Sequence, residues 1–78
     1  MPVYYFHIRS ERGVHPDTEG VRLADGEAVR REAIDRALVE MSEGAKHDED
    51  RMRWMFDVRD DADRPVLSFP FADAIPAG

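Results

Sequence analysis

Residues 25–44 read DGEAVRREAIDRALVEMSEG and form the one stretch of the chain with sustained helical periodicity. Apolar side chains recur at Ile34, Leu38 and Met41, a spacing that places them along one face of a helix, and Ala33, Ala37 and Ala45 widen this stripe. The rest of the chain consists of short segments with strand-like alternation. We therefore predict one helix over residues 25–44, with its Ile34, Leu38 and Met41 ridge covered by a small sheet.

The ends of this helix carry residues that favour capping. Asp25 can accept hydrogen bonds from the first turn, and Gly44 can take the left-handed conformation that often ends a helix. Arg30 interrupts the apolar face, because it lies four residues before Ile34. We expect its stem to lie along the sheet while the guanidinium reaches Asp17, Asp25 or a backbone carbonyl. An anion-binding role for Arg30 is the alternative.

Four stretches of alternating side chains flank the helix, at residues 3–9, 14–15, 52–59 and 65–71. Alternation gives a strand one apolar side. The inward side chains are then Tyr4, Phe6, Trp54, Phe56, Leu67 and Phe69. We predict an α+β domain of order β-β-α-β-β, a four-stranded antiparallel sheet with one helix packed on one face. The strand order 2-1-3-4 is expected, since the second and fourth strands carry prolines that suit an edge.

Residues 17–20 read DTEG and predict a turn. The Asp17 carboxylate can accept backbone N–H groups, and Gly20 can take a positive φ. A phosphate-binding loop is the alternative, but a single glycine without a Gly-Lys-Ser/Thr pattern gives it little support. Asp17, Gly20, Asp25 and Arg30 are therefore expected to be structural residues.

The composition limits both size and function. The 78 residues predict a single domain over 1–78, with a tail at 72–78 that little holds in place. The chain has no cysteine, and 17 acidic against 11 basic residues give a net charge of −6. Because the acidic residues are spread along the chain, we do not expect nucleic acid to be the main partner. No apolar run approaches a membrane span and no signal peptide is recognised at the start, so we expect a cytoplasmic protein without membrane contact.

Three stretches resemble a family of short alphaproteobacterial proteins described as a domain of unknown function. They are the opening PVYYFHIR, the DTEGVRL turn before the helix, and the closing VLSFPFADA. The resemblance implies a small cytoplasmic bacterial protein and brings no activity, cofactor or catalytic residue. The turn DDADR at residues 60–64 departs from the family, where a glycine is frequent, which puts a tight hairpin there in question.

Catalysis and metal binding find little support in the residue pattern. His7 faces outward on the first strand and Asp57 is expected opposite it, an arrangement that can serve acid–base chemistry. No serine or cysteine stands in a nucleophile motif, and a cross-strand polar pair explains both residues. The three histidines show no metal-ligand spacing. We therefore predict no enzyme, no cofactor and no metal, and keep a His7-dependent activity as a minor alternative.

The outer side of the sheet is the most informative surface, because one helix leaves it uncovered. Its candidate interaction residues are Tyr5, His7, Arg9, Arg53, Met55, Arg59 and Val66. A bare, solvated sheet face is one interpretation. We predict protein–protein contact, as a homodimer or as an accessory regulator that binds another protein. Weak binding of single-stranded nucleic acid, with bases stacking on this face, is the alternative.

Overall fold

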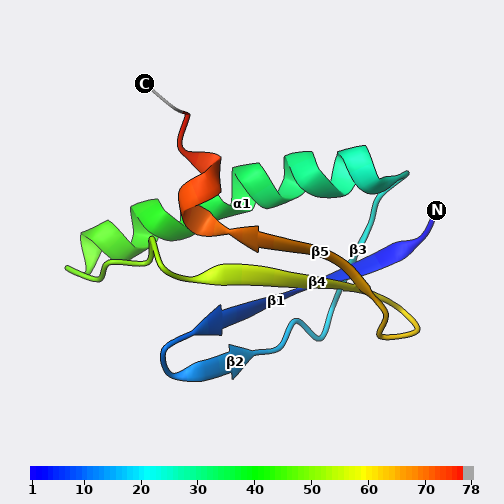
Figure 1. Ribbon diagram of the computed structural model, residues 1–78, viewed down its shortest axis with the longest axis horizontal. Coiled ribbons are helices and arrows are strands. Elements are labelled where there is room, and N and C mark those ends of the chain that lie inside the picture. The colour runs from blue at the N-terminus through cyan, green and yellow to red at the C-terminus, as the bar shows by residue number, and fades with distance from the viewer. Residues whose placement is uncertain (77–78) are drawn as a thin grey trace.

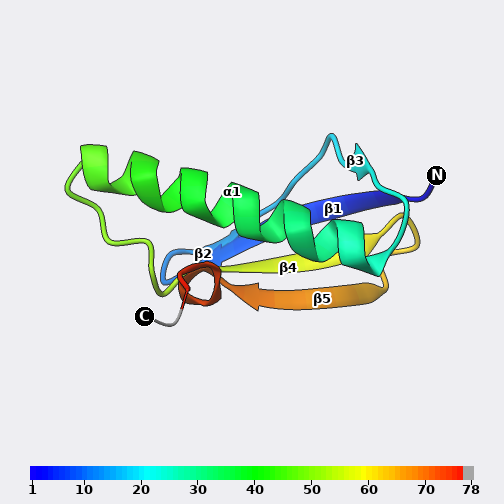
Figure 2. The same ribbon diagram turned by 90° about the horizontal axis from the view of Figure 1, so that it is seen from above.

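A computed structural model, which describes residues 1–76, places the chain in two layers, a helix and an antiparallel sheet (Figures 1 and 2). Its elements are β1 (Val3–Ser10), β2 (Gly13–His15), β3 (Val21–Arg22), α1 (Gly26–Lys46), β4 (Met55–Asp60), β5 (Pro65–Pro70) and the 3-10 helix η1 (Phe71–Ala74). The predicted α+β class, with α1 on one face of the sheet, is confirmed. No helix within residues 1–76 is long and apolar enough to cross a membrane.

The sheet has five strands rather than the predicted four. The order β2-β1-β4-β5 agrees with the order predicted for the four longer strands, and the additional strand β3 pairs with β1. In β3, Val21 and Arg22 lie opposite Tyr4 and Val3. Two residues are too few to produce an alternation pattern, so the sequence indicated only an approach to the helix at this point.

Large aromatic side chains on the inner face of the sheet form most of the core. The buried members of the predicted inward set are Tyr4, Phe6, Trp54, Phe56 and Phe69, and Leu67 is partly buried. Phe6 and Phe56 meet edge to face with ring centroids 5.6 Å apart, and Phe56 lies 4.7 Å from Phe71. These contacts across β1, β4 and η1 confirm the predicted inward side of each long strand.

The helix packs on these rings through small residues, not through the predicted ridge. Val29, Ala33 and Ala37 are fully buried, whereas Leu38 is 44% exposed and the other two ridge residues are partly buried. The sheet already fills the space between the layers with aromatic volume, so α1 approaches by its least bulky face. Periodicity identified the helix and the buried Ala33 and Ala37 of its apolar stripe, but it wrongly placed Leu38 at the centre of the buried face.

The N-terminal end of α1 is as predicted, whereas its C-terminal end is not. Asp25 caps the helix by accepting a hydrogen bond of 2.9 Å from the Ala28 N–H. Gly44 does not follow the helix but lies within it, since α1 continues to Lys46. A Cβ at Gly44 would lie 2.7 Å from the carbonyl oxygen of Glu49. Glycine is therefore required by the close approach of the next loop, not by a positive φ.

Arg30 contacts an aromatic ring rather than an acid. Its guanidinium carbon lies 5.5 Å from the centroid of the Phe69 ring, within the range of a cation–π contact. Its predicted partners are engaged elsewhere, because Asp25 caps α1 and Asp17 accepts backbone hydrogen bonds from β1 and from its own turn. Arg30 therefore has the expected position along the sheet but a different partner.

The chain after β5 is more firmly held than the sequence indicated. Phe71 and Ala74 of η1 are buried, and the Phe71 N–H donates a hydrogen bond of 2.9 Å to the Trp54 carbonyl. The first part of the predicted tail 72–78 is thus packed beside α1 (Figure 1). Residues 77–78 of that tail lie outside the described residues.

The β4–β5 turn forms a hairpin without glycine. Asp63 takes a left-handed φ of 61°, and asparagine and aspartate are among the side chains that tolerate this conformation best. The Asp60 carboxylate accepts hydrogen bonds of 2.9 Å from the N–H groups of Ala62 and Arg64. The bond from Arg64 in particular lowers the pKa of Asp60 below its ordinary value of 3.8. The lack of glycine at residues 60–64 therefore leaves the hairpin turn intact, and the doubt about a tight hairpin there was wrong.

Candidate functional site

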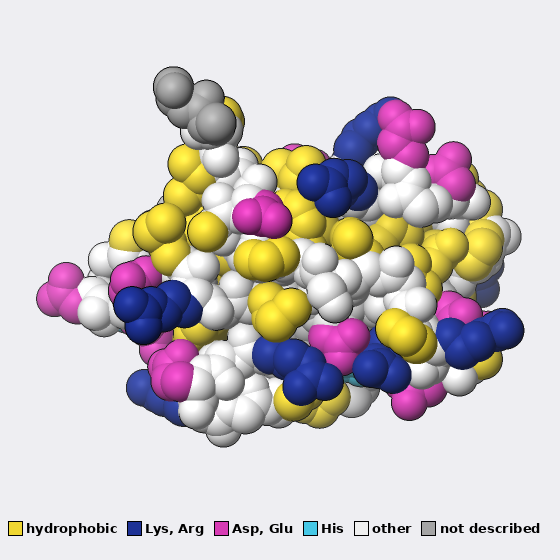
Figure 3. Space-filling view, viewed as in Figure 1, with side chains coloured by type: hydrophobic (Ala, Val, Ile, Leu, Met, Phe, Trp, Pro, Cys, Tyr) yellow, Lys and Arg dark blue, Asp and Glu magenta, His cyan; other side chains and the backbone are white. Residues whose placement is uncertain are grey.

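The outer face, as we call the side of the sheet opposite α1, carries no covering layer of residues 1–76 (Figures 1 and 2). Its strand register brings together Tyr5 with Arg59, His7 with Asp57 and Arg9 with Met55. Figure 3 shows hydrophobic side chains next to charged ones over β4 and β5. Five of the seven predicted interaction residues are brought together by this register, and Arg53, from the turn before β4, lines a depression with Arg9 and Met55. Val66 lies in β5 where the register to β4 shifts, and it is 38% exposed.

Asp57 is the organising residue of the outer face. It is only 7% exposed, although it lies on the uncovered side of the sheet. Arg9 approaches its Oδ2 atom through Nη2 at 3.1 Å, and Arg59 approaches the same atom through Nε at 3.2 Å. Burial opposes ionisation of Asp57, but hydrogen bonds from both arginines outweigh it and hold its pKa below the ordinary 3.8. Two guanidinium groups are thereby fixed side by side.

His7 is held by the 16–20 loop and not by Asp57. The two residues are cross-strand partners, as predicted, but the Asp57 carboxylate binds the arginines. The Nδ1 atom of His7 accepts a hydrogen bond of 3.0 Å from the Asp17 N–H. Neutral His7 therefore carries its proton on Nε2. The imidazole orients a loop, and the expected acid–base partner is occupied.

Asp17 links the loop to β1 with both carboxylate oxygens. Its Oδ1 accepts from the N–H groups of Glu19 and Gly20 at 3.0 and 3.2 Å, which confirms the predicted turn. Its Oδ2 accepts from the Phe6 N–H at 3.0 Å, where β1 lies between its β2 and β3 pairings. Burial opposes ionisation, yet these backbone hydrogen bonds lower the pKa of Asp17 below 3.8. The turn sequence alone did not reveal the bond to β1.

Gly20 positions the Tyr5 ring at the edge of the outer face. It has the predicted positive φ, 72°. A Cβ at this residue would lie 2.8 Å from a carbon of the Tyr5 ring. The Tyr5 and His7 rings are nearly parallel, with an interplanar angle of 9° and centroids 6.3 Å apart. Gly20 is therefore needed for both its conformation and its contact.

The two ends of the outer face differ in charge. At the start of β4, Arg9 and Arg53 line a shallow depression of about 340 Å³ together with Met55, Ser10 and Glu11. At the other end, the β4–β5 turn carries three aspartates in DDADR. The charge separation follows from the strand register, which places Arg9 beside the first residue of β4 and Tyr4 beside the last. The sequence indicated these arginines but not the separation of charge between the two ends of the outer face.

The histidines take separate structural positions. His15 lies over Trp54 with ring centroids 6.0 Å apart, and its Nε2 is 3.3 Å from the Ser10 hydroxyl. His47 is the C-cap of α1. Within residues 1–76, no group of three or more histidine, cysteine, aspartate or glutamate side chains is arranged to hold a metal ion.

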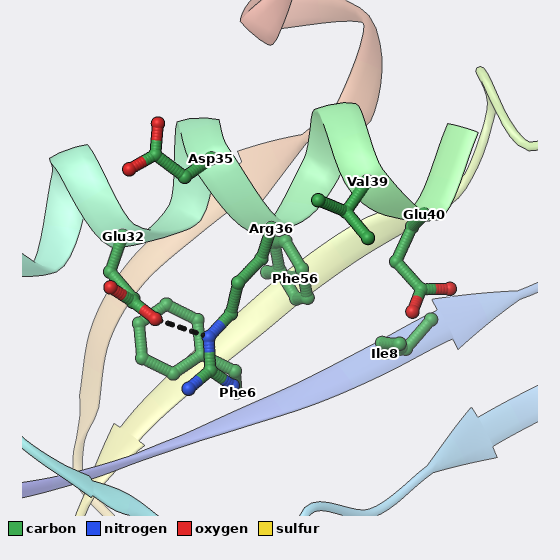
Figure 4. Close-up of a pocket in the computed structure, with 8 residues that line it drawn as sticks. All are labelled: Phe6, Ile8, Glu32, Asp35, Arg36, Val39, Glu40 and Phe56. Atoms are coloured by element: carbon green, nitrogen blue, oxygen red, sulfur yellow. Dashed lines mark hydrogen bonds and ion pairs between the residues drawn. The ribbon is translucent and has the colours of Figure 1, made fainter. Parts of the chain in front are cut away.

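A second surface, which the sequence did not indicate, lies on the helix side of the sheet. We call it the groove, and it encloses about 510 Å³. Its floor consists of Phe6, Ile8 and Phe56, and α1 forms its wall with Glu32, Asp35, Arg36, Val39 and Glu40 (Figure 4). Arg36 reaches across the floor, with its guanidinium carbon 4.7 Å from the Phe6 ring centroid. The misplaced helix face explains why sequence reasoning missed it.

The fold and its two surfaces define a small two-layer α+β domain whose polar groups gather on open surfaces. Residues 3–72 match a domain of unknown function (DUF6894), and the chain belongs to this family. The resemblance to an uncharacterised family is thereby confirmed. No curated protein and no solved structure matches the chain.

Proposed function

We propose that this protein acts without catalysis, through protein–protein contact made by the outer face, and that its first partner is a second copy of the chain. The observation that carries the proposal is the Arg9–Asp57–Arg59 cluster, which holds two arginines in place next to Met55. Arginine, tyrosine and methionine are enriched in protein interfaces. Side chains fixed before binding lose less entropy when a partner arrives.

Charge complementarity favours a second copy over an unrelated protein. Two facing sheets related by a twofold axis that runs across their strands place the β4 strands antiparallel. The basic end with Arg9 and Arg53 then lies against the acidic β4–β5 turn of the other copy, which includes Asp61. This contact between the basic end and the acidic turn is formed twice in such a dimer. An acidic surface of another protein, the accessory-regulator alternative, would engage the basic end only.

A charge-swap experiment tests this arrangement. Arg53 and Asp61 are both exposed, and neither holds another element in place through a side-chain hydrogen bond within residues 1–76. We expect Arg53→Glu and Asp61→Lys each to weaken the dimer about tenfold or more, as removal of complementary charge pairs does. The double variant should regain most of the affinity. Sedimentation equilibrium at micromolar concentrations measures the dissociation constant.

Lys46→Glu serves as the matched control, because it makes the same charge change on an exposed residue at the end of α1. Its dissociation constant should stay within about twofold of the wild type. A strictly monomeric wild-type chain would overturn the homodimer. A double variant no better than either single variant would overturn the twofold pairing of the two ends.

Single-stranded nucleic acid is a second candidate ligand of the outer face. The parallel Tyr5 and His7 rings, flanked by Arg9 and Arg59, offer aromatic and basic groups of the kind that bind bases and phosphates. Titration with a fluorescent oligothymidylate at about 50 mM and 200 mM salt tests it. Absence of salt-sensitive binding at the lower concentration would rule it out.

A non-catalytic role is consistent with how the candidate groups are used. His7 accepts a hydrogen bond from Asp17, and Asp57 is bonded to two arginines. The family resemblance supports a bacterial, cytoplasmic protein, and we include both in the proposal. A His7→Gln variant that retains the dimer would agree with a structural His7.

A further inference from the structure

The single long helix covers only part of the inner face of the sheet. Strands in a sheet lie about 4.8 Å apart, and a helix with its side chains is about 10 Å wide. One helix therefore spans about two strands, whereas the main sheet path contains four, β2-β1-β4-β5. The helix packs mainly on β5 and η1. On the β1 side of the inner face, Tyr4 and Phe6 are buried but Ile8 is only partly covered, and the groove lies there.

The groove combines an apolar floor with a mostly acidic wall. Phe6, Ile8 and Phe56 face the same side as the core, and Val39 on the helix wall is 61% exposed. The wall adds the carboxylates of Glu32, Asp35 and Glu40 against one guanidinium, that of Arg36. Arg51 pairs with Glu40 at 2.8 Å, so acids outnumber bases three to two even when it is included. Asp35 forms no ion pair within residues 1–76.

Arg36 indicates which chemistry this surface accepts. Its guanidinium lies over the Phe6 ring at 4.7 Å and is bound by Glu32 at 2.7 Å (Figure 4). A cation is thus already stabilised by an aromatic face together with a carboxylate. At the end of the groove beyond Arg36, which Ile8, Val39 and Glu40 line, the Glu40 carboxylate likewise holds a guanidinium, that of Arg51 at 2.8 Å. Among the described residues, Asp35 is therefore the acid of the groove wall that remains for a further cation.

We propose that the groove is a docking site for a basic amphipathic helix of another protein, which would lie beside α1 on the sheet. A helix satisfies its own backbone hydrogen bonds, so it can enter an apolar groove at little polar cost. Its apolar side chains contact Ile8 and Val39, the groove residues whose apolar surface is partly exposed. Its lysine or arginine side chains lie against the acidic wall and complement the net charge of −6.

A designed peptide pair tests this site. The first peptide has about 18 residues, long enough for helix formation, with leucine at i, i+3, i+4 and i+7 spacing and lysine on the flanks. The second replaces every lysine with glutamate. We expect the lysine peptide to bind the full chain and the glutamate peptide to bind at least about tenfold more weakly, as opposite charge dictates. Fluorescence anisotropy measures both affinities.

Two substitutions on neighbouring helix residues locate the binding site. Val39→Lys places a cation in the groove and removes an apolar contact, and we expect about tenfold weaker binding of the lysine peptide or more. Leu38→Lys makes the same charge change at an exposed residue that does not line the groove. The affinity of the Leu38→Lys variant for the lysine peptide should stay within about threefold of the wild-type value. Circular dichroism confirms that both variants fold.

The outcomes separate this site from the outer face. Equal affinity for the two peptides, or equal losses in Val39→Lys and Leu38→Lys, would overturn the proposal. Amide chemical-shift changes that map to Met55 and Arg59 instead of Ile8 and Phe56 would also overturn it. Arg53→Glu should leave peptide affinity within about threefold of wild type, since it lies outside the groove lining.

Discussion

The outer face and the groove lie on opposite sides of the same two strands, β1 and β4, and are built in opposite ways. The outer face has charge at its centre, where Asp57 is enclosed by Arg9 and Arg59. The groove has an apolar centre, Phe6 and Phe56, with charge on its wall. An internally neutralised polar face is stable in water. The Phe6 and Phe56 rings of the groove are already only 3% and 2% exposed, so the apolar surface that a partner can still cover there belongs to Ile8 and Val39.

Removing the carboxylate of Asp57 should have the largest effect on the free energy of unfolding, and the structural change should be confined to the outer face. In Asp57→Ala, two guanidinium groups remain close together without the anion that separates them. We expect a loss of about 2–3 kcal/mol in the free energy of unfolding, below the full cost of a deeply buried pair because Arg9 is half exposed. Urea unfolding followed by Trp54 fluorescence measures it.

The contrast with the groove supplies the control for that experiment. Glu32→Ala removes the carboxylate of an i,i+4 pair on α1 that is about one-third exposed, and about 0.5 kcal/mol is typical of i,i+4 pairs on helix surfaces. Equal losses of unfolding free energy in Asp57→Ala and Glu32→Ala would show that the greater burial of Asp57 does not make its ion pairs more important for stability.

Strand alternation predicted the sheet and the outer face because both follow from one local rule. Once Tyr4 and Phe6 face inward, Tyr5 and His7 must face outward, and the pairing of β1 with β4 brings His7 opposite Asp57. These inferences need only the order of residues along each strand. Five of the seven residues of the predicted interaction face were found together for this reason.

The groove and the Asp17 link could not be predicted in this way, because they depend on distances between layers. Which side of α1 is buried is decided by the volume that Phe56 and Phe69 occupy, not by the hydrophobicity of the helix itself. Leu38 was therefore assigned to the core and lies half exposed. The bond from the Phe6 N–H to Asp17 exists because β2 and β3 leave a gap along β1, which no local pattern records.

Gly44→Ala should have the next largest effect on the free energy of unfolding. It acts at the end of α1 that lies near the groove. Alanine in a helix is normally about 1 kcal/mol more favourable than glycine. Here its Cβ would meet the Glu49 carbonyl at 2.7 Å and the Arg51 side chain at 2.8 Å, so the loop must move. We expect a net loss of about 1–2 kcal/mol, measured by thermal unfolding, together with weaker contact between Arg51 and Glu40.

Gly26→Ala is the matched control on the same helix, because a Cβ there meets nothing within 4 Å. It should be neutral or stabilise the protein by up to about 1 kcal/mol. If Gly44→Ala were also stabilising, the close approach of the 47–51 loop to α1 would be refuted.

Acid should weaken the part of the sheet that Asp17 and Asp57 hold together. Both carboxyl groups have a pKa below the ordinary 3.8 in the folded chain. Their contribution to stability is therefore complete above about pH 4 and is lost as the pH falls through the folded values. We expect Asp17→Asn to cost about 1 kcal/mol at pH 7 through weakened hydrogen bonds and less at pH 2. Urea unfolding of the wild type and of Asp17→Asn at several pH values measures this difference. A loss of unfolding free energy that did not change with pH would contradict the prediction.

Arg36→Met should have the smallest effect on stability and the most informative effect on binding. Methionine keeps helix propensity and apolar contact with Phe6, so only a partly exposed cation–π contact and an ion pair are lost. We expect a decrease of at most about 1 kcal/mol in the free energy of unfolding. The substitution also removes the one cation of the groove wall, and the lysine peptide should then bind about threefold more tightly or better. Stronger binding of the glutamate peptide instead would show that the wall selects anions, and the groove would then resemble the basic end of the outer face.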